Sequence, residues 1–136
     1  MPTRDIPEPA RPITRDVLLR AHLQQAKQTH DIEFRRIHIV PGHAVGLHAH
    51  NGPVVGSILD GSATFQIDGE PESILGPGDV FFEPEGARIA RFDARDEGVT
   101  FLAYFLLEQG QDPDISFPDE YVQSEQAESG RAVHET

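Results

Sequence analysis

The sequence predicts an all-β domain, either a sandwich or a barrel. Short apolar stretches recur between residues 32 and 107, with turn residues between them at roughly eight- to twelve-residue spacing. Two Asp-Gly pairs, Asp60-Gly61 and Asp68-Gly69, indicate tight hairpins, because Gly tolerates positive φ and Asp bonds the local backbone. A chain of 136 residues buries one core but not two. We therefore expect one barrel with appendages and a single pocket.

The first 28 residues are assigned to an arm that precedes the barrel. Residues 1–13 contain four prolines and are expected to be extended. Residues 15–28 leave two structures open. Thr14 suits the cap of a short helix, and the Gln, Ala and Lys residues that follow favour helix. The run Val17-Leu18-Leu19 would equally suit the start of an edge strand.

Seven or so strands are expected within residues 29–107, the predicted barrel. The stretches that indicate them are 32–40, 54–59, 63–67, 80–83, 87–92 and 100–107. Residues 108–136 form an acidic tail in which apolar side chains become sparse. Residues 115–122 keep enough of them to dock locally. From about residue 123 onward, burial no longer offsets the ordering entropy, so we expect disorder there.

Charge and composition exclude several classes of partner. The formal net charge is -12 and basic residues are not clustered, which argues against nucleic acid, because phosphate binding needs grouped Lys and Arg. The adjacent pair Arg35-Arg36 makes no patch, since neighbouring residues of a strand point to opposite faces. The absence of Cys removes disulfides and thiolate sites. No apolar run approaches the ~18 residues of a membrane span, so we expect no membrane partner and a cytoplasmic protein.

The candidate site is built on two histidines that follow a turn. His48 and His50 come after Pro41-Gly42 and are two residues apart. On a strand they would project from the same face, where neutral imidazoles can converge on one metal ion. The sequence therefore predicts a pocket with His48 and His50 as its metal ligands, if a metal is bound.

With these turns and this pair, the chain resembles the small single-domain cupins of bacteria. The first cupin motif corresponds to Pro41-Gly42, His48, His50, Val54 and Gly61, and the second to Gly78-Asp79, Pro84-Glu85-Gly86, Ile89 and Asp93. The resemblance covers residues 32–107. It implies a double-stranded β-helix of the jelly-roll type, here with an extended N-terminal arm and a partly disordered acidic C-terminal tail.

The resemblance also implies a metal site, and this sequence departs from it at two positions. Metal-binding cupins typically use both histidines, a Glu and a later His. The Glu position holds Val54 and the later His position holds Ile89. Two imidazoles alone hold a divalent ion weakly. We therefore expect either no cofactor or a weakly bound iron, nickel, manganese or zinc ion at His48 and His50.

The other residues predicted to bind a ligand follow from strand alternation. Val54 and Ile89 are expected in an apolar pocket wall. Arg91 shares the face of Ile89 in an alternating strand, where its guanidinium would hold a carboxylate or another anion. Gln66 and Tyr104 complete the predicted ligand-binding set. Two further candidates, Glu83 and His43, depend in the same way on strand register, which the sequence does not fix.

Three functions are compatible with these residues. The first is a small-molecule-binding protein with a degenerate metal site and a small organic anion as ligand, which the sequence favours. The second is a metal-dependent enzyme, an oxygenase or isomerase, in which an unrecognised third ligand joins His48 and His50. The third is a structural protein with a vestigial pocket. The resemblance to cupins implies a homodimer. The strands with Phe81-Phe82 and residues 101–105 support this expectation, because both of their faces are apolar and the outer one needs a cover.

Overall fold

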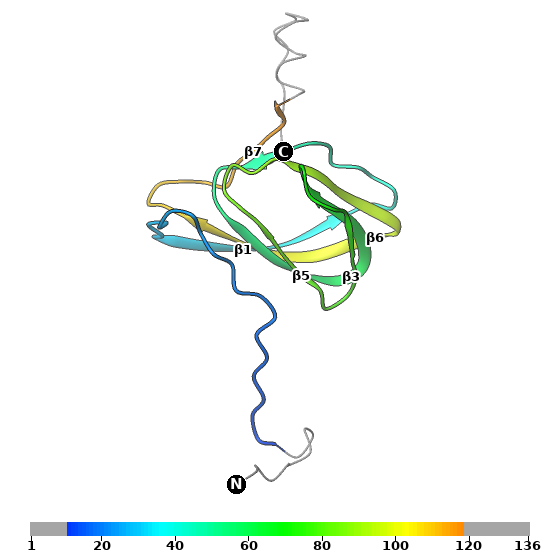
Figure 1. The fold of residues 1–136 in the computed structure, drawn as a ribbon, viewed down its shortest axis with the longest axis horizontal. Helices are drawn as coiled ribbons and strands as arrows, with labels where there is room; N and C mark the ends of the chain where they lie inside the picture. The colour runs from blue at the N-terminus through cyan, green and yellow to red at the C-terminus, as the bar shows by residue number, and fades with distance from the viewer. Residues whose placement is uncertain (1–10, 119–136) are drawn as a thin grey trace, which may run out of the picture.

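Seven strands arranged in two sheets make up the regular secondary structure of residues 11–118, the part of the chain that the computed structural model describes (Figure 1). The strands are β1 (Asp31–Ile39), β2 (Ala49–His50), β3 (Val54–Ile67), β4 (Ser73–Leu75), β5 (Val80–Glu83), β6 (Ile89–Leu107) and β7 (Ile115–Ser116). All pairings between them are antiparallel. The predicted all-β class is therefore confirmed.

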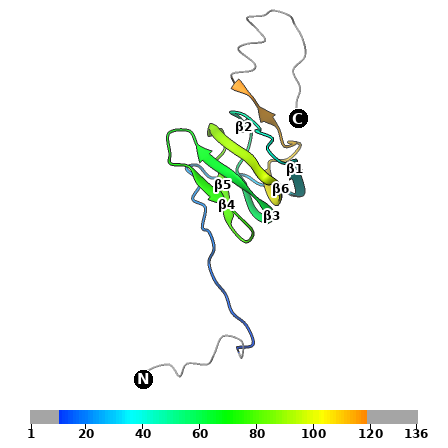
Figure 2. The same ribbon diagram turned by 90° about the vertical axis from the view of Figure 1, so that its right-hand side faces the viewer.

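The long strands β3 and β6 form the centre of the larger sheet. Its order is β1-β6-β3-β4, and β5 also pairs with β3. The second half of β6 pairs with β1, whereas its first half lies beside the segment before β2 through the bridges Ala44↔Asp93 and His48↔Ile89. Both strands bend, so the sheet rolls up (Figures 1 and 2), as the jelly-roll prediction requires. One end of the barrel carries the small sheet of β2 and β7.

Of the two Asp-Gly pairs, Asp68-Gly69 makes the β3–β4 turn and Asp60-Gly61 does not make a hairpin. Strand β3 continues through Asp60-Gly61 with register shifts on both sides. Gly61 has φ 75°, and a Cβ there would lie 2.0 Å from the carbonyl oxygen of Gly98. The glycine serves a close approach of two backbones at a bend, which local sequence does not distinguish from a turn.

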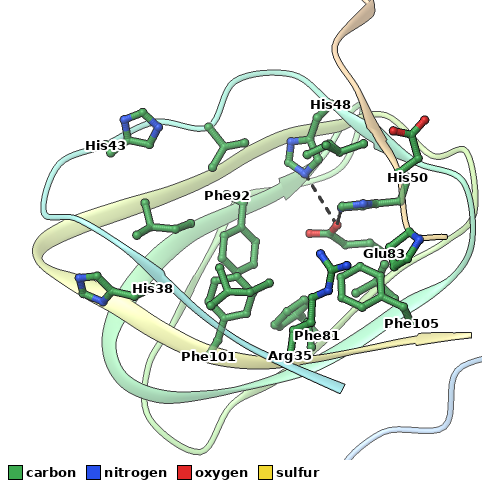
Figure 3. A pocket seen from close by; sticks show the side chains of 18 of the residues that line it. Arg35, His38, His43, His48, His50, Phe81, Glu83, Phe92, Phe101 and Phe105 are labelled. Atoms are coloured by element: carbon green, nitrogen blue, oxygen red, sulfur yellow. Dashed lines mark ion pairs between the residues drawn. The ribbon is translucent and has the colours of Figure 1, made fainter. Parts of the chain in front are cut away.

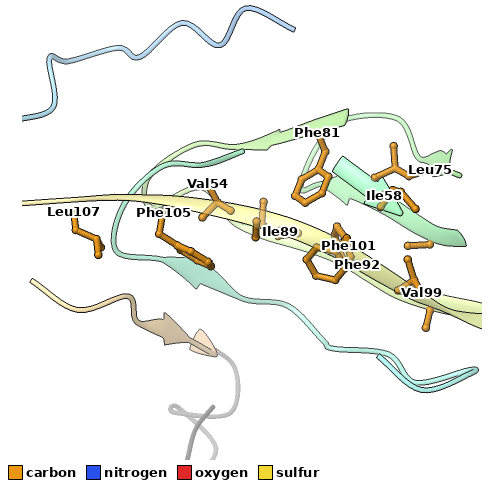
Figure 4. Packing of buried hydrophobic residues seen from close by; sticks show 13 residues of the cluster. Val54, Ile58, Leu75, Phe81, Ile89, Phe92, Val99, Phe101, Phe105 and Leu107 are labelled. Atoms are coloured by element: carbon orange, nitrogen blue, oxygen red, sulfur yellow. The ribbon is translucent and has the colours of Figure 1, made fainter. Parts of the chain in front are cut away.

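The core is aromatic at its centre. Phe92 packs edge-to-face against Phe81 and in a tilted geometry against Phe101, with ring centroids 5.1 and 4.8 Å apart (Figure 4). Gly56 makes room for this cluster, since a Cβ at Gly56 would lie 2.3 Å from the Phe81 ring. Phe82 points away from the core and is only half-buried, in keeping with strand alternation.

The arm before β1 has neither of the two structures that the sequence left open. Residues 11–30 contain no helix and no strand, and Figures 1 and 2 show their first part running away from the barrel. Lys27 fixes the end nearest the barrel, where its buried ammonium group contacts Glu85 and Glu108 at 3.3 and 3.5 Å. The apolar side chains of Val17 and Leu18 are exposed. Without neighbours on the same chain, neither helix nor strand gains the burial that would stabilise it.

The tail docks at its beginning. Strand β7 pairs with β2, and Asn51 binds the tail through its side chain, donating to the Asp112 carbonyl at 2.9 Å and accepting from the Asp114 amide at 3.0 Å. The local docking predicted for residues 115–122 is thus seen for residues 115–118. The disorder expected from about residue 123 lies outside the described residues. Among residues 11–118, no helix has the length and apolar character that crossing a bilayer requires.

Candidate functional site

His48 and His50 lie at the end of the barrel that the tail covers, and their rings face one interior. The ring centroids are 5.2 Å apart and nearly perpendicular, with an interplanar angle of 82°. Nδ1 of His48 lies 2.8 Å from the carbonyl oxygen of Gly46. Because a carbonyl only accepts, Nδ1 carries the proton and donates it. The Nε2 atom of His48 is left to face the interior as a donor atom for a ligand or ion.

Glu83 is the third member of this group. Its Oε1 atom lies 2.9 Å from Nε2 of His50 and 3.8 Å from Nε2 of His48 (Figure 3). Both Glu83 and His48 are only 3% exposed. One ligand atom from each of the three residues lies within 4.8 Å of the other two. The structure therefore gathers two imidazoles and one carboxylate in a buried cluster, the His–His–Glu group.

Strand register explains why the carboxylate is in this place. Glu83 lies directly opposite Val54 in the antiparallel pairing of β5 with β3, and residues opposite each other present their side chains on the same face. Val54 occupies the position where the cupin motif has Glu. The carboxylate is thus absent from β3 and present on the neighbouring strand. Alternation along β5 gives Phe81 and Glu83 the same inward face.

The members of the group perturb one another electrostatically. For His48, burial is the largest effect and lowers the pKa, but the nearby Glu83 carboxylate, the Gly46 carbonyl and the charge of Asp93 together raise the pKa above its ordinary 6.5. For Glu83, burial is again the largest effect and raises the pKa, yet the two imidazoles outweigh it and lower the pKa below 4.5. Glu83 is therefore ionised at neutral pH although it is buried.

A cavity of about 770 Å³ opens beside the group. Its walls are mostly apolar and include Val54, Phe92, Phe101 and Phe105. Figure 3 shows the His–His–Glu group at one end of this space and His38 and His43 at the other. The volume falls within the range of about 300–1,000 Å³ that is usual for small-molecule sites.

The residues predicted from the sequence are only partly brought together. Val54, His48 and His50 line the cavity. Ile89 is completely buried and exchanges two backbone hydrogen bonds with His48, at 2.7 and 3.1 Å, but its side chain is not part of the cavity wall. His43 lines the far end of the cavity and is exposed.

Arg91 lies on the outside of the barrel, which corrects its predicted inward position. A β-bulge is the cause: Gln66 pairs with Arg91 while Ile67 pairs with Ile89, so Ala90 is an extra residue on β6. The bulge breaks the alternation, and Ile89 and Phe92 both point inward. Arg91 is half-exposed and forms ion pairs with Glu72 and Asp93 at 3.0 and 3.2 Å.

Gln66 and Tyr104 also lie outside the cavity. The Gln66 side chain donates to the carbonyl of Glu70 at 2.8 Å. Tyr104 stacks on Phe34 with ring centroids 4.2 Å apart, on the face of β6 opposite to Phe105. Both residues lie in strands, as the sequence predicts, but the side that each residue faces depends on bulges and register.

Two residues of the cavity were not singled out as its functional groups by the sequence. Glu83 is a candidate whose face the sequence does not fix, and the signal for an inward position is its spacing of two residues from Phe81. The sequence indicates for Arg35 only a place in a basic pair that makes no patch, yet Arg35 lines the cavity. In β1 it shares a face with Ile37 and Ile39, and the opposite face holds Ile32 and Phe34, so the apolar pattern does not tell which side is interior.

The donor set of the His–His–Glu group fits a divalent transition-metal ion. Donor atoms about 2.1 Å from an ion are about 3.0–3.4 Å apart when they are neighbours in a tetrahedral or octahedral shell. The separations of 2.9 and 3.8 Å from Glu83 to the two imidazoles lie close to this range. Two His and one carboxylate are a combination that suits Fe(II), Mn(II) or Zn(II).

Comparison with known proteins places the chain in a family. The sequence model of the family described as Cupin domain matches residues 35–102. The chain belongs to this family. Among curated proteins, none matches this cupin in sequence.

Solved structures resemble this cupin over its barrel. The DMSP lyase DddQ from Ruegeria pomeroyi DSS-3 is 25% identical with a TM-score of 0.55, over 64% of this chain and 43% of that one. Oxalate decarboxylase from Bacillus subtilis, with Mn(II) centres, is 26% identical with a TM-score of 0.52, over 60% of this chain and 22% of that one. This cupin thus spans less than half the length of either enzyme.

A cupin-like protein from Thermotoga maritima MSB8 is closer in size. It is 20% identical with a TM-score of 0.55, over 74% of this chain and 75% of that one. At this identity the likeness establishes the fold alone, and it agrees with the jelly-roll barrel of residues 31–107.

Proposed function

We propose that this cupin holds one divalent transition-metal ion with His48, His50 and Glu83 and binds a small organic molecule in the cavity beside that ion. The observation that carries the proposal is the buried Glu83 carboxylate, 2.9 Å from His50 and ionised at neutral pH. It supplies the third ligand that a metal-dependent function needs and that the motif position at Val54 lacks.

The residues around the group favour this function. Nδ1 of His48 donates to the Gly46 carbonyl and thereby fixes the ring with Nε2 toward the interior. Val54 and Phe105 keep the group in apolar surroundings, which strengthens electrostatic interactions. A metal ion held by three protein ligands would polarise an oxygen atom of the bound molecule as a Lewis acid. The two similar enzymes, a DMSP lyase and a Mn(II) oxalate decarboxylase, support a metal-dependent reaction on a small organic molecule.

The test is metal binding by the full chain. We expect one equivalent of Mn(II), Fe(II), Ni(II) or Zn(II) by elemental analysis, and a matching stoichiometry by titration calorimetry. The variants His50→Ala and Glu83→Gln each remove one donor and should weaken binding by more than about a hundredfold, since even the loss of supporting residues costs 10–100-fold. The control variants His43→Ala and Asp114→Asn alter cavity residues outside the group and should bind normally. Failure of the unmodified chain to bind any of the four ions would overturn the proposal.

A second candidate is a metal-free binding protein, and one observation favours it. Nε2 of His50 already lies within hydrogen-bonding distance of Glu83, and the Glu83 carboxylate raises the pKa of His48, so the group is satisfied without an ion. In that case the cavity would still take a ligand while metal titrations show none. If neither metal nor any small molecule binds, the remaining candidate is a structural protein with a vestigial pocket.

A further inference from the structure

We propose that Arg35 anchors a carboxylate group of the ligand, so that the cavity takes organic acids with an apolar chain or ring. This inference rests on the proposed function, because it assigns a ligand class to the same cavity. In β1, Arg35 shares the inward face with Ile37 and Ile39, and all three line the cavity. Among the cavity-lining residues that the structure describes, Arg35 is the single Lys or Arg.

A small residue on the neighbouring strand, Ala103, leaves space in front of Arg35. Arg35 pairs with Ala103 of β6, which pairs in turn with Gly56 of β3, and Gly56 pairs with Phe81 of β5. In this row across the sheet, two small residues separate the guanidinium from the Phe81 ring. A larger side chain at Ala103 would fill the space. The cavity is therefore open where Arg35 enters it.

The guanidinium is held in place but keeps free donors. Nε donates to Oε2 of Glu33, and Nη2 forms an ion pair with the same oxygen. The Phe105 ring lies beneath the group, with Cζ 5.2 Å from the ring centroid. Arginine has five N–H donors in a planar fork. The Nη1 end makes no ion pair or hydrogen bond with the described residues, which leaves that edge available to a carboxylate.

Arg35 and the His–His–Glu group lie close enough to be occupied by one small molecule. The Phe105 ring contacts both sides, since its centroid is also 6.1 Å from that of His50. Figure 3 shows the Arg35 side chain pointing into the cavity toward Glu83 and His50. The other charged residues of the wall are Glu83 and Asp114. A divalent ion would offset the negative charges of Glu83, Asp114 and the Glu33 carboxylate that pairs with Arg35, so that these acidic residues no longer repel an anion near the guanidinium.

The rest of the cavity wall determines the chemical character of the ligand beyond its carboxylate group. Between Arg35 and the far end, where His38 and His43 lie (Figure 3), the cavity is bounded by Ile37, Ile39, Phe92 and Phe101. These side chains cannot pair with a second charged group. A ligand with one carboxylate at Arg35 and an apolar remainder therefore matches both parts of the wall.

The experiment compares straight-chain acids with their amides on the metal-loaded full chain, by calorimetry or ligand-observed NMR. The probes are butyrate, hexanoate and octanoate with the three matching amides, which differ in charge but hardly in shape. We expect each acid to bind about tenfold more tightly than its amide, the low end for a charged hydrogen bond, because Arg35 is half-exposed. Affinity should also rise with chain length, by up to about fourfold per methylene.

Variants separate this inference from the proposed function. Arg35→Gln should abolish the preference for acids over amides while metal binding stays unchanged. Arg35→Lys should retain part of it, since charge remains but the fork is lost. Ala103→Leu should block all six probes and leave metal binding intact.

The possible outcomes then fall on different claims. If the unmodified chain binds no metal, the proposed function is contradicted. The acid–amide comparison can then still be made on the metal-free protein. Equal binding of acids and amides, or an acid preference that survives in Arg35→Gln, overturns the assignment of Arg35.

Discussion

Exchanging Val54 and Glu83 is the sharpest test of how the metal group is built. The two residues are directly opposite on β3 and β5, so their Cβ atoms are about 4.5–5.5 Å apart on one face. If the carboxylate has only changed strands, a Val54→Glu/Glu83→Val double variant should still present it to His48 and His50. The exchange conserves buried volume, so its cost in stability should stay below about 1.5 kcal/mol.

The single variants set the scale. Glu83→Val removes the carboxylate and should weaken metal binding by more than about a hundredfold, and the double variant should recover to within about tenfold of the unmodified chain. Val54→Glu alone places two carboxylates about 5 Å apart, which repel by roughly 3 kcal/mol at an effective dielectric constant of about 20. At about 4 °C per kcal/mol, the metal-free protein should melt roughly 12 °C lower. Metal should restore most of this loss.

The four proteins of the double-mutant cycle are the unmodified chain, the two single variants and the double variant. Titration calorimetry measures their metal affinity, and thermal melts measure their stability. The reasoning is refuted if the double variant is folded and yet binds metal no better than Glu83→Val. It is also refuted if Val54→Glu melts normally without metal, since the two carboxylates would then not face each other.

Two further predictions follow from the charges and the arm. In the metal-free protein, the lowered pKa of Glu83 gives stability that is fully present above pH 4.5 and is lost as the pH falls through the lowered pKa. The raised pKa of His48 gives stability that is fully present below pH 6.5 and is lost as the pH rises through the raised pKa. The free energy of unfolding lost in Glu83→Gln, measured by denaturant titration, should thus be largest between pH 4.5 and 6.5 and decline on both sides; a flat difference would contradict it. The homodimer stays a prediction: the exposed Val17 and Leu18 suggest that the arm packs on a second copy, so deletion of residues 1–22 should convert a dimer to a monomer in light scattering, and a monomeric full chain would show the expectation to be wrong.

The sequence by itself determined the barrel and two of the three residues of the metal group. Turn residues such as Pro41-Gly42, Asp68-Gly69 and Gly78-Asp79 act locally, because they impose backbone dihedral angles whatever surrounds them. The His-x-His spacing likewise acts through a local rule, the alternation of side chains along a strand. A fold assembled from such signals can be predicted from the chain alone.

The tertiary structure decided which side chains meet. Glu83 joins the histidines only because β5 pairs with β3 in the register that places it opposite Val54. Arg91 leaves the interior because one extra residue, Ala90, forms a bulge against β3. Strand β1 has two half-apolar faces, and the face with Ile37 and Ile39 is the one that lines the cavity. Arg35 lies on that face and therefore enters the cavity. A shift of one residue moves a side chain to the other face of a strand, and register is set by pairing between distant segments rather than by local sequence.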